Sequence, residues 1–274
     1  VSNYVTAVYG DPASANGLGV TIATCLFAVQ IYCDFSGYTD IAIGAARMMG
    51  IRLMQNFDRP YIAKSISEFW RRWHISLSSW FKDYLYFPLG GSRCSTARCC
   101  FNLAVVFIVS GLWHGAAWTF VIWGVLHAFY QVVERLLRDK RKAFDEKAEK
   151  KGYGRVLDAA RTAWTFILVT FAWIFFRAGS VADLRVLLSA LFTKWSFSAD
   201  YFAQTLDHMG ITLTGTIITV LSIITMSLID RVKDKESKAA PLCEYGKNSR
   251  VITAERIYLV WIVASAWLLL LSSG

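Results

Sequence analysis

Long apolar runs separated by short polar segments dominate the chain. Several approach the roughly 20 residues that a helix needs to cross a bilayer. The runs cover residues 17–33, 101–113, 116–133, 156–176, 210–229 and 257–272. Because backbone polar groups inside a membrane must be satisfied by the segment itself, apolar runs of this kind favour helices. The pattern predicts an all-α integral membrane protein: a multi-spanning helical bundle with re-entrant or interfacial amphipathic helices.

The first apolar run continues past two acidic residues. Residues 17–33 lead into Asp34 and Asp40, and apolar character then resumes up to Met49, which predicts one long or broken helix. A carboxylate at membrane depth is costly unless it is paired or faces a polar cavity, so Asp34 and Asp40 are functional candidates. An equally good interpretation is structural: either carboxylate neutralises an arginine such as Arg47.

Residues 65–82 have a different pattern, in which aromatic and aliphatic residues recur at helical spacing and charged residues occupy the opposite face. This predicts a helix that lies in the interface or re-enters the membrane, with Trp70, Trp73 and His74 facing the bundle. Ser65 and Glu68 form an S-x-x-E capping box at its start. A second amphipathic stretch, around 181–195, is expected on the surface.

Composition excludes a soluble domain, since 55% of the residues are hydrophobic and 15% aromatic, against roughly 45–50% apolar in soluble proteins. The net charge of +9 does not indicate nucleic-acid binding, because the basic residues cluster between apolar runs. Segments 135–155 and 230–256 hold nine and seven basic residues, whereas 179–207 holds two. The positive-inside rule predicts that 135–155 and 230–256 are cytoplasmic loops and that 179–207 and the C-terminus lie outside.

The cysteines and the first residue bear on domain organisation. The six cysteines contain no C-x-x-C pair, so neither a disulfide framework nor a zinc site is expected. The cluster of Cys94, Cys99 and Cys100 is either a set of small apolar residues or an acylation site at a membrane edge. The chain opens at Val1, without a signal-peptide pattern. We therefore expect one transmembrane domain over residues 1–274, part of a longer protein.

Four histidines are candidates for acid–base chemistry. His114 lies between two apolar runs, and Gly111 and Gly115 beside it form a G-x-x-x-G motif that allows close helix packing. An imidazole there can accept and return a proton, or it can be a hydrogen-bonded bundle histidine. His74 is a weaker candidate on the same grounds. His127 suits a hydrogen bond across the bundle, and His208 an ordinary interfacial position.

Five motifs resemble those of the bacterial membrane-bound O-acyltransferases, in particular the alginate-acetylation branch. They occur in the family's order between residues 30 and 125. The motifs are DFSGYTD (34–40), NFDRPY (56–61), EFWRRWHISLSSWFKDYLY (68–86), PLGG (88–91) and SGLWHGA (110–116). The resemblance implies that His114 is the catalytic histidine and His74 the second motif histidine. It also makes the chain the C-terminal part of such a protein.

The resemblance implies acetyl transfer from a cytosolic thioester, acetyl-CoA, to hydroxyls of an extracytoplasmic polysaccharide, directly or through a periplasmic acetyltransferase. No bound cofactor or metal is expected, nucleic acid is not a partner, and lipids of the bacterial inner membrane surround the protein. His114 then acts as general base or as transient acyl carrier. The expected substrate-binding residues are Asp34, Trp70, Arg71, Arg72, Trp73 and Trp113.

Two other functions are compatible with these residues. One is D-alanyl transfer from a carrier protein to teichoic acid, which uses a similar histidine arrangement. The other is a non-enzymatic transporter or flippase, which would also suit aromatic helices with two acidic residues. Arg71 and Arg72 can meet donor phosphates at the cytoplasmic mouth, or lipid headgroups in any of these functions.

Overall fold

The computed structural model describes residues 1–239, and all regular elements in that range are helical. The chain divides into two compact units: one comprises Tyr4–Phe197 and the other begins at Ser198. The expected span at 257–272 and the segment after residue 239 of the expected loop 230–256 lie outside the described residues.

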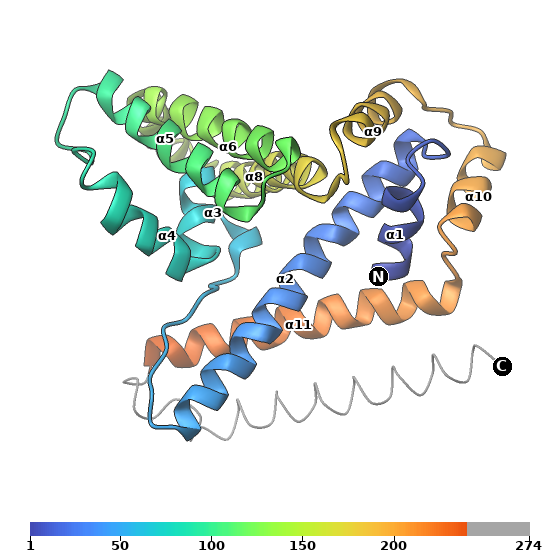
Figure 1. Cartoon of the computed structure of the whole chain (residues 1–274), viewed down its shortest axis with the longest axis horizontal. Coiled ribbons are helices and arrows are strands. Elements are labelled where there is room, and N and C mark those ends of the chain that lie inside the picture. Colours follow the sequence, from blue (N-terminus) through green and yellow to red (C-terminus); the bar gives the residue numbers. More distant parts are fainter. Residues whose placement is uncertain (240–274) are drawn as a thin grey trace. The chain divides into compact units, whose positions relative to one another are not determined.

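The first unit carries the helices that build the candidate site (Figure 1). They are α1 (Ser2–Gly10), α2 (Gly17–Met48), η1 (Pro60–Ile62), α3 (Ile66–Arg72), α4 (Ile75–Phe81), η2 (Lys82–Tyr86), α5 (Thr96–His114), α6 (Trp118–Leu136), α7 (Arg138–Lys150), α8 (Gly154–Arg177) and α9 (Val181–Thr193). The second unit contains α10 (Ala199–His208) and α11 (Leu213–Ala239).

Three of these helices, α2, α5 and α8, are long and apolar enough to cross a membrane. Two bent pairs bring the number to five: α6 with α7, bent by 62°, and residues 199–208 with 213–228, bent by 76°. The predicted multi-spanning helical protein is thus confirmed for residues 1–239. The stretch from residue 17 to 48 is a single unbroken helix, and 181–195 contains α9 as expected.

Helices α5 and α6 form a tight hairpin that places His114 at its tip (Figure 1). A Cβ atom added to Gly111 would lie 2.5 Å from the Phe120 carbonyl oxygen, and one on Gly124 would lie 2.5 Å from that of Phe107. Only glycine permits this approach of two backbones. The predicted close packing at Gly111 is present, and its partner across the hairpin is Gly124.

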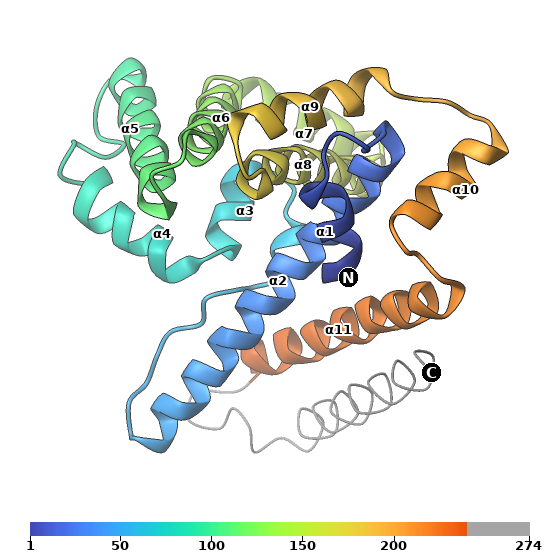
Figure 2. The same cartoon turned by 45° about the vertical axis from the view of Figure 1, so that its right-hand side comes forward.

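Helices α8 and α9 pack against α6 and complete the bundle of the first unit (Figure 2). Its interior is aromatic: the rings of Trp123 and Trp173 are stacked with centroids 6.1 Å apart, and Trp73 lies 5.2 Å from Trp173. All three side chains are at most 4% exposed. This cluster ties the short helix α3 to α6 and α8.

The prediction of one helix over residues 65–82 was wrong. Helix α3 ends at Arg72, α4 begins at Ile75, and a π-helical turn, η2, follows from Lys82. The break falls at His74, whose φ of +46° lies in the left-handed region. None of these short helices is a candidate span, in agreement with the predicted interfacial or re-entrant path.

The segment expected to be a cytoplasmic loop, 135–155, is largely helical. It holds the end of α6 and the whole of α7, which buries no residue. Helix α7 consists mostly of Lys, Arg, Glu and Ala, which are good helix formers, so its charge indicated exposure without indicating coil. Helix α1 was not anticipated. The membrane side of 135–155 remains a prediction.

Candidate active site

The helix break at His74 is stabilised by hydrogen bonds from Asn56. The backbone oxygen of Asn56 accepts from the Ile75 amide at 3.0 Å, and its side-chain oxygen accepts from the amide and hydroxyl of Ser76 at 3.1 and 2.9 Å. These contacts satisfy the free N–H groups at the start of α4. Asn56 thereby allows a new helix to begin directly after His74.

Asn56 also orients the His74 ring, since its side-chain oxygen lies 3.2 Å from Nδ1 of His74. An amide oxygen accepts only, so Nδ1 carries the proton and Nε2 keeps a free lone pair in the neutral ring. Burial, and secondarily the neighbouring His114, lowers the pKa of His74 to about 4. His74 is therefore a neutral acceptor at physiological pH.

Asn56 was missed as a site residue. It lies within the NFDRPY motif, which indicated family resemblance but not a role for its first residue. Only 7% of Asn56 is exposed, and a buried amide requires partners. The sequence contains no sign that those partners are His74 and Ser76, which follow 18 and 20 residues later.

Trp113 lies between the two predicted catalytic histidines. Its ring centroid is 5.0 Å from that of His114 and 6.3 Å from that of His74. On its other side His74 contacts Phe35 edge-on at 4.7 Å. Trp113 itself is 58% exposed. The structure thus brings together Trp113 and His114 from the end of α5 and His74 from the break between α3 and α4.

The His114 ring is held by aromatic contacts. Trp123 and Phe176 meet it nearly perpendicularly, with centroids 5.3 and 5.2 Å away. Within residues 1–239 neither ring nitrogen of His114 has a hydrogen-bond partner, and the residue is only partly buried. Ring nitrogens that are positioned but unpartnered can accept a proton or form a covalent bond.

His127 makes a hydrogen bond across the bundle, as its sequence position suggested. It is fully buried on α6, and its Nδ1 accepts a hydrogen bond from the Trp70 indole N–H at 3.2 Å. Trp70 was expected to bind substrate. Its N–H serves His127, while its ring lines an apolar cavity described below.

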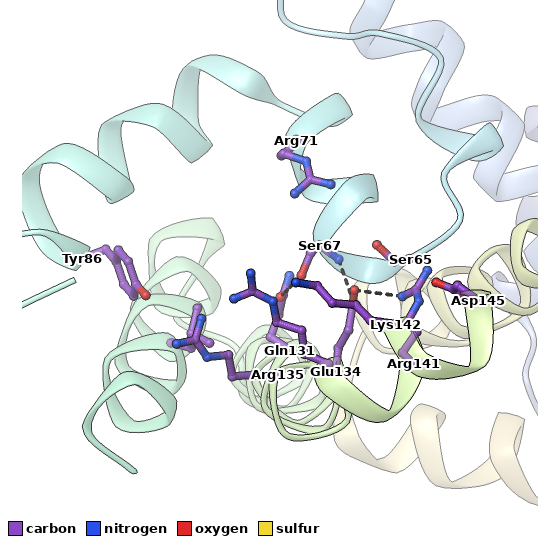
Figure 3. A pocket seen from close by; sticks show the side chains of 12 residues that line it. Ser65, Ser67, Arg71, Tyr86, Gln131, Glu134, Arg135, Arg141, Lys142 and Asp145 are labelled. Carbon is purple, nitrogen blue, oxygen red and sulfur yellow. Dashed lines mark hydrogen bonds and ion pairs between the residues drawn. The ribbon is translucent and has the colours of Figure 1, made fainter. Parts of the chain in front are cut away.

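A basic cavity of about 510 Å³ opens between α3, α6 and α7 (Figure 3). Five cations line it, against two carboxylates. The cations are Arg71, Arg135, Arg138, Arg141 and Lys142, and the carboxylates are Glu134 and Asp145. Arg141 pairs with Glu134 at 3.3 Å and Asp145 with Arg161. The other four cations have no carboxylate partner in the described part of the chain, so the cavity suits an anion.

An apolar cavity of about 250 Å³ adjoins the basic one and shares Arg71, Tyr86 and Gln131 with it. It extends to Ser110 on α5 and Ser78 on α4. Ser110 precedes His114 by four residues, and Ser78 follows His74 by four residues. Four residues are about one helical turn. The apolar cavity thus comes within about one helical turn of each histidine along the chain, although neither histidine lines it.

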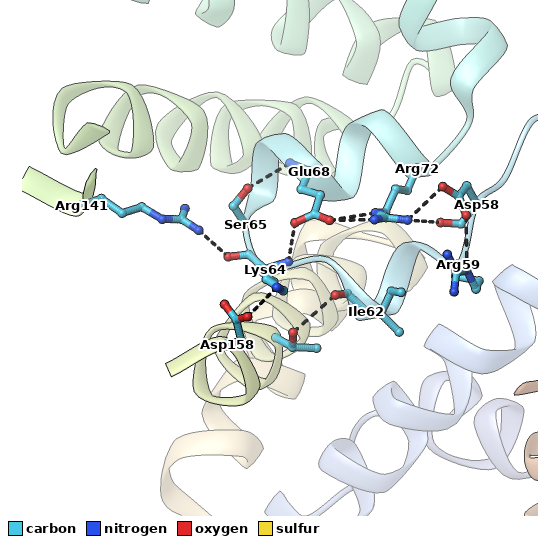
Figure 4. Close-up of polar contacts among 10 residues, drawn as sticks. Asp58, Arg59, Ile62, Lys64, Ser65, Glu68, Arg72, Arg141 and Asp158 are labelled. Atoms are coloured by element: carbon cyan, nitrogen blue, oxygen red, sulfur yellow. Dashed lines mark hydrogen bonds and ion pairs between the residues drawn. The ribbon is translucent and has the colours of Figure 1, made fainter. Parts of the chain in front are cut away.

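Arg72 holds neighbouring segments together (Figure 4), and its expected role in substrate binding remains a prediction. Its guanidinium pairs with Asp58 and with Glu68, each at 2.9 Å. Glu68 also accepts from the Lys64 amide at 2.9 Å, while the Ser65 hydroxyl accepts from the Glu68 amide at 3.0 Å. The predicted capping box is present, with the carboxylate reaching one residue further back than Ser65.

The remaining predicted substrate residues lie apart from the cavities. Trp73 is 4% exposed and belongs to the aromatic core. Asp34 is exposed on α2, next to Phe35, which contacts the His74 ring. Their roles as substrate-binding residues remain predictions. Among the described residues no group of three His, Cys, Asp or Glu side chains could hold a metal ion.

The family assignment follows from comparison with known proteins. The model of the MBOAT, membrane-bound O-acyltransferase, family matches residues 15–175, which include both histidines and all of α2–α6. The chain therefore belongs to the membrane-bound O-acyltransferase family. Together with its apolar helices, this makes it a multi-pass membrane protein.

Individual relatives agree with this assignment. A probable alginate O-acetylase AlgI of Pseudomonas putida is 36% identical over 248 residues, 87% of this chain and 48% of that protein. A peptidoglycan O-acetyltransferase of Helicobacter pylori is 44% identical over 164 residues, 59% of this chain and 29% of its own length. A teichoic acid D-alanyltransferase of Streptococcus thermophilus is more distant, 29% identical over 155 residues, 53% of this chain and 37% of that protein. The chain spans about half the length of the first of these relatives and a smaller share of the other two.

Proposed function

We propose that this chain forms the transfer site of an O-acetyltransferase in the bacterial inner membrane. The whole protein would move acetyl groups from cytosolic acetyl-CoA to hydroxyls of an extracytoplasmic polysaccharide, alginate-like or another envelope glycan, directly or through a periplasmic acetyltransferase. The relatives named as an alginate O-acetylase and a peptidoglycan O-acetyltransferase support the acetyl group and a glycan acceptor.

The observation that carries the proposal is the grouping of His74 and His114 around Trp113. Two adjoining cavities, one basic and one apolar, lie in the same unit. The four cations without carboxylate partners are suited to the phosphates of acetyl-CoA. The apolar cavity is suited to its uncharged thioester arm. If the segment 135–155 is cytoplasmic, the basic cavity opens toward the compartment that contains the donor.

Two chemical routes follow from a neutral His114. As general base, it takes the proton of the acceptor hydroxyl while the oxygen attacks the thioester carbon; the C–S bond breaks and the leaving thiolate receives that proton. As acyl carrier, a ring nitrogen attacks the thioester carbon, the C–S bond breaks and the thiolate leaves. The acceptor hydroxyl then attacks the acyl group, the C–N bond breaks, and the hydroxyl proton passes to the thiolate. In both, the Trp113 indole N–H is our candidate donor to the developing oxyanion, since neutral His74 presents a lone pair and Trp73 is in the core.

D-alanyl transfer is the second candidate, supported by the teichoic acid D-alanyltransferase relative. That donor would be a thioester on a carrier protein, which also has a phosphate near its arm. The longer and higher-identity matches to the acetylating relatives favour acetyl transfer.

The test uses the full-length protein in inside-out membrane vesicles that contain the acceptor polymer. Acetyl-CoA labelled in the acetyl group should transfer label to polymer only when the protein is present, and excess unlabelled CoA should compete. Transfer from a D-alanyl carrier protein in place of acetyl-CoA would establish the second candidate. Absence of transfer from either donor, with normal protein levels, would reject the acyltransferase proposal.

A further inference from the structure

Two cysteines lie in contact beside the basic cavity. The Sγ atoms of Cys94 and Cys99 are 3.1 Å apart, and both thiols lie near the carbonyl oxygen of Gly91, at 3.3 and 3.6 Å. Asn102 donates to the same carbonyl at 3.2 Å. The loop that follows the PLGG motif is thus folded back onto the first turns of α5, which keeps the two sulfurs together.

The two thiols differ in exposure and in position relative to α5. Cys99 is fully buried within α5, whereas Cys94 is partly exposed and lies outside the helix, before its N-cap Ser95. A reagent can therefore reach Cys94 first. A disulfide has its sulfurs about 2.05 Å apart, so a shift of roughly 1 Å in the loop would close the bond.

A cation lies beside the buried thiol, because the Arg135 guanidinium donates to Cys99 Sγ at 3.8 Å. Arg135 also lines the basic cavity, together with Tyr86. The cysteine pair is therefore connected to that cavity through Arg135.

We propose that Cys94 and Cys99 form a reversible, oxidant-sensitive dithiol at the rim of the basic cavity. The oxidant is a low-molecular-weight disulfide such as oxidised glutathione. The Cys94 thiolate attacks one of its sulfurs, breaking the S–S bond and releasing one thiolate. Cys99 then attacks the Cys94 sulfur of the mixed disulfide and releases the second thiolate. Two protein thiols are oxidised, one disulfide is reduced to two thiols, and these take up the two protons.

The hydrogen bond to Cys99 raises the pKa of the Cys94 thiol. The reactive thiolate is thus a minor species at neutral pH, and oxidation should need minutes of exposure rather than seconds. The disulfide would draw Cys99 Sγ away from the Arg135 guanidinium. It would thereby remove one contact of a cation that lines the basic cavity. The dithiol proposal itself does not depend on the proposed function, because it concerns only the two thiols.

The experiment uses full-length protein in membranes, treated with oxidised glutathione and then with a maleimide of high mass in denaturant. The wild type should lose two maleimide additions after oxidation and regain both with dithiothreitol. Cys94→Ser should abolish this loss, whereas Cys99→Ala should lose a single addition, because Cys94 then stops at the mixed disulfide. Cys100→Ala is the matched control, since this neighbouring cysteine is also partly buried, and it should behave as wild type.

Trypsin gives an independent reading, because it cleaves after Arg93 and Arg98 and separates the two cysteines. Oxidation should remove the free peptide 94–98 and reduction should restore it. Retention of that peptide after oxidation, or loss of the effect in Cys100→Ala, would overturn the proposed pair. If Cys99→Ala does not accumulate in the membrane, Cys94→Ser alone decides, since its side chain is partly exposed.

Discussion

The side-chain oxygen of Asn56 lies 3.2 Å from Nδ1 of His74 and positions this histidine, which separates helices α3 and α4. The same oxygen accepts from Ser76, so one buried amide determines both the chain path and the ring orientation. This couples the local fold to the lone pair that His74 presents.

Replacement of Asn56 by Ala should therefore lower activity more than it lowers protein abundance. An imidazole without its orienting partner samples the wrong tautomer, a change that costs up to about 10⁴-fold in a serine protease; here we expect roughly 10-fold or more. The measurement is polymer-bound acetate per amount of full-length protein in the membrane. Thr39→Ala is the control, since it removes only the 3.4 Å contact to the Asn56 amide nitrogen. Equal effects of the two substitutions would contradict an orienting role.

His114→Gln should abolish acetylation while the protein still accumulates. Loss of a general base costs about 10²–10⁴-fold in rate, and loss of a covalent carrier more. Acetate on the polymer, normalised to membrane protein, measures the effect. His127→Gln is the matched control: it disturbs the bond to Trp70, so it should reduce abundance and spare activity per molecule. Near-normal acetate in His114→Gln would make His114 a bundle histidine and favour the transporter alternative.

Arg71 and Arg72 are neighbours with different surroundings, so substitution of each should have a different effect. Arg71→Ala removes a cavity cation and should raise the KM for acetyl-CoA roughly 10- to 100-fold, as expected for a lost charged hydrogen bond of about 1.5–3 kcal/mol. Arg72→Ala removes two ion pairs and should lower thermal stability with an unchanged KM. Initial rates against donor concentration and melting in detergent distinguish the two. A raised KM for Arg72→Ala alone would reverse the assignment.

The lowered pKa of His74, about 4, predicts an unusual pH response. In the unfolded chain its pKa is near 6.5, so between pH 6.5 and 4 the unfolded state binds more protons and stability falls as pH falls. His74→Gln should remove this contribution. As the pH is lowered from 7 to 5, the melting temperature of the wild type should therefore fall more than that of the variant. A wild-type advantage that grows with acidity would show that the folded state favours charged His74.

The basic segment 135–155 is predicted to be cytoplasmic. A single cysteine introduced at Lys147, in full-length protein that lacks its native cysteines, should resist an impermeant maleimide in intact cells and react after permeabilisation. A cysteine at Arg185, in the sparsely basic segment 179–207, should react in intact cells. The opposite pattern would invert the orientation and place the basic cavity on the outer side.

Periodicity and composition determined the class of this protein. Apolar runs predicted α2, α5, α6 and α8 because a span needs a minimum apolar length whatever it packs against. His114 stood out because an ionisable ring beside glycines within apolar sequence has few ordinary explanations. The helical state of α7 was missed, since charge density reports exposure and both exposed coil and exposed helix satisfy it.

Only the tertiary structure decided how the site is assembled. Asn56 and His74 meet across a break that overrides the helical periodicity of 65–82, because hydrogen bonds from a distant amide cap α4. Arg71 and Lys142 share one cavity although α4, α5 and α6 lie between them in the chain. A local pattern records which face of a helix avoids water, but it does not record which other segment that face will meet. Cavities, ion pairs and the sulfur contact of Cys94 with Cys99 depend on which segments meet in the folded chain.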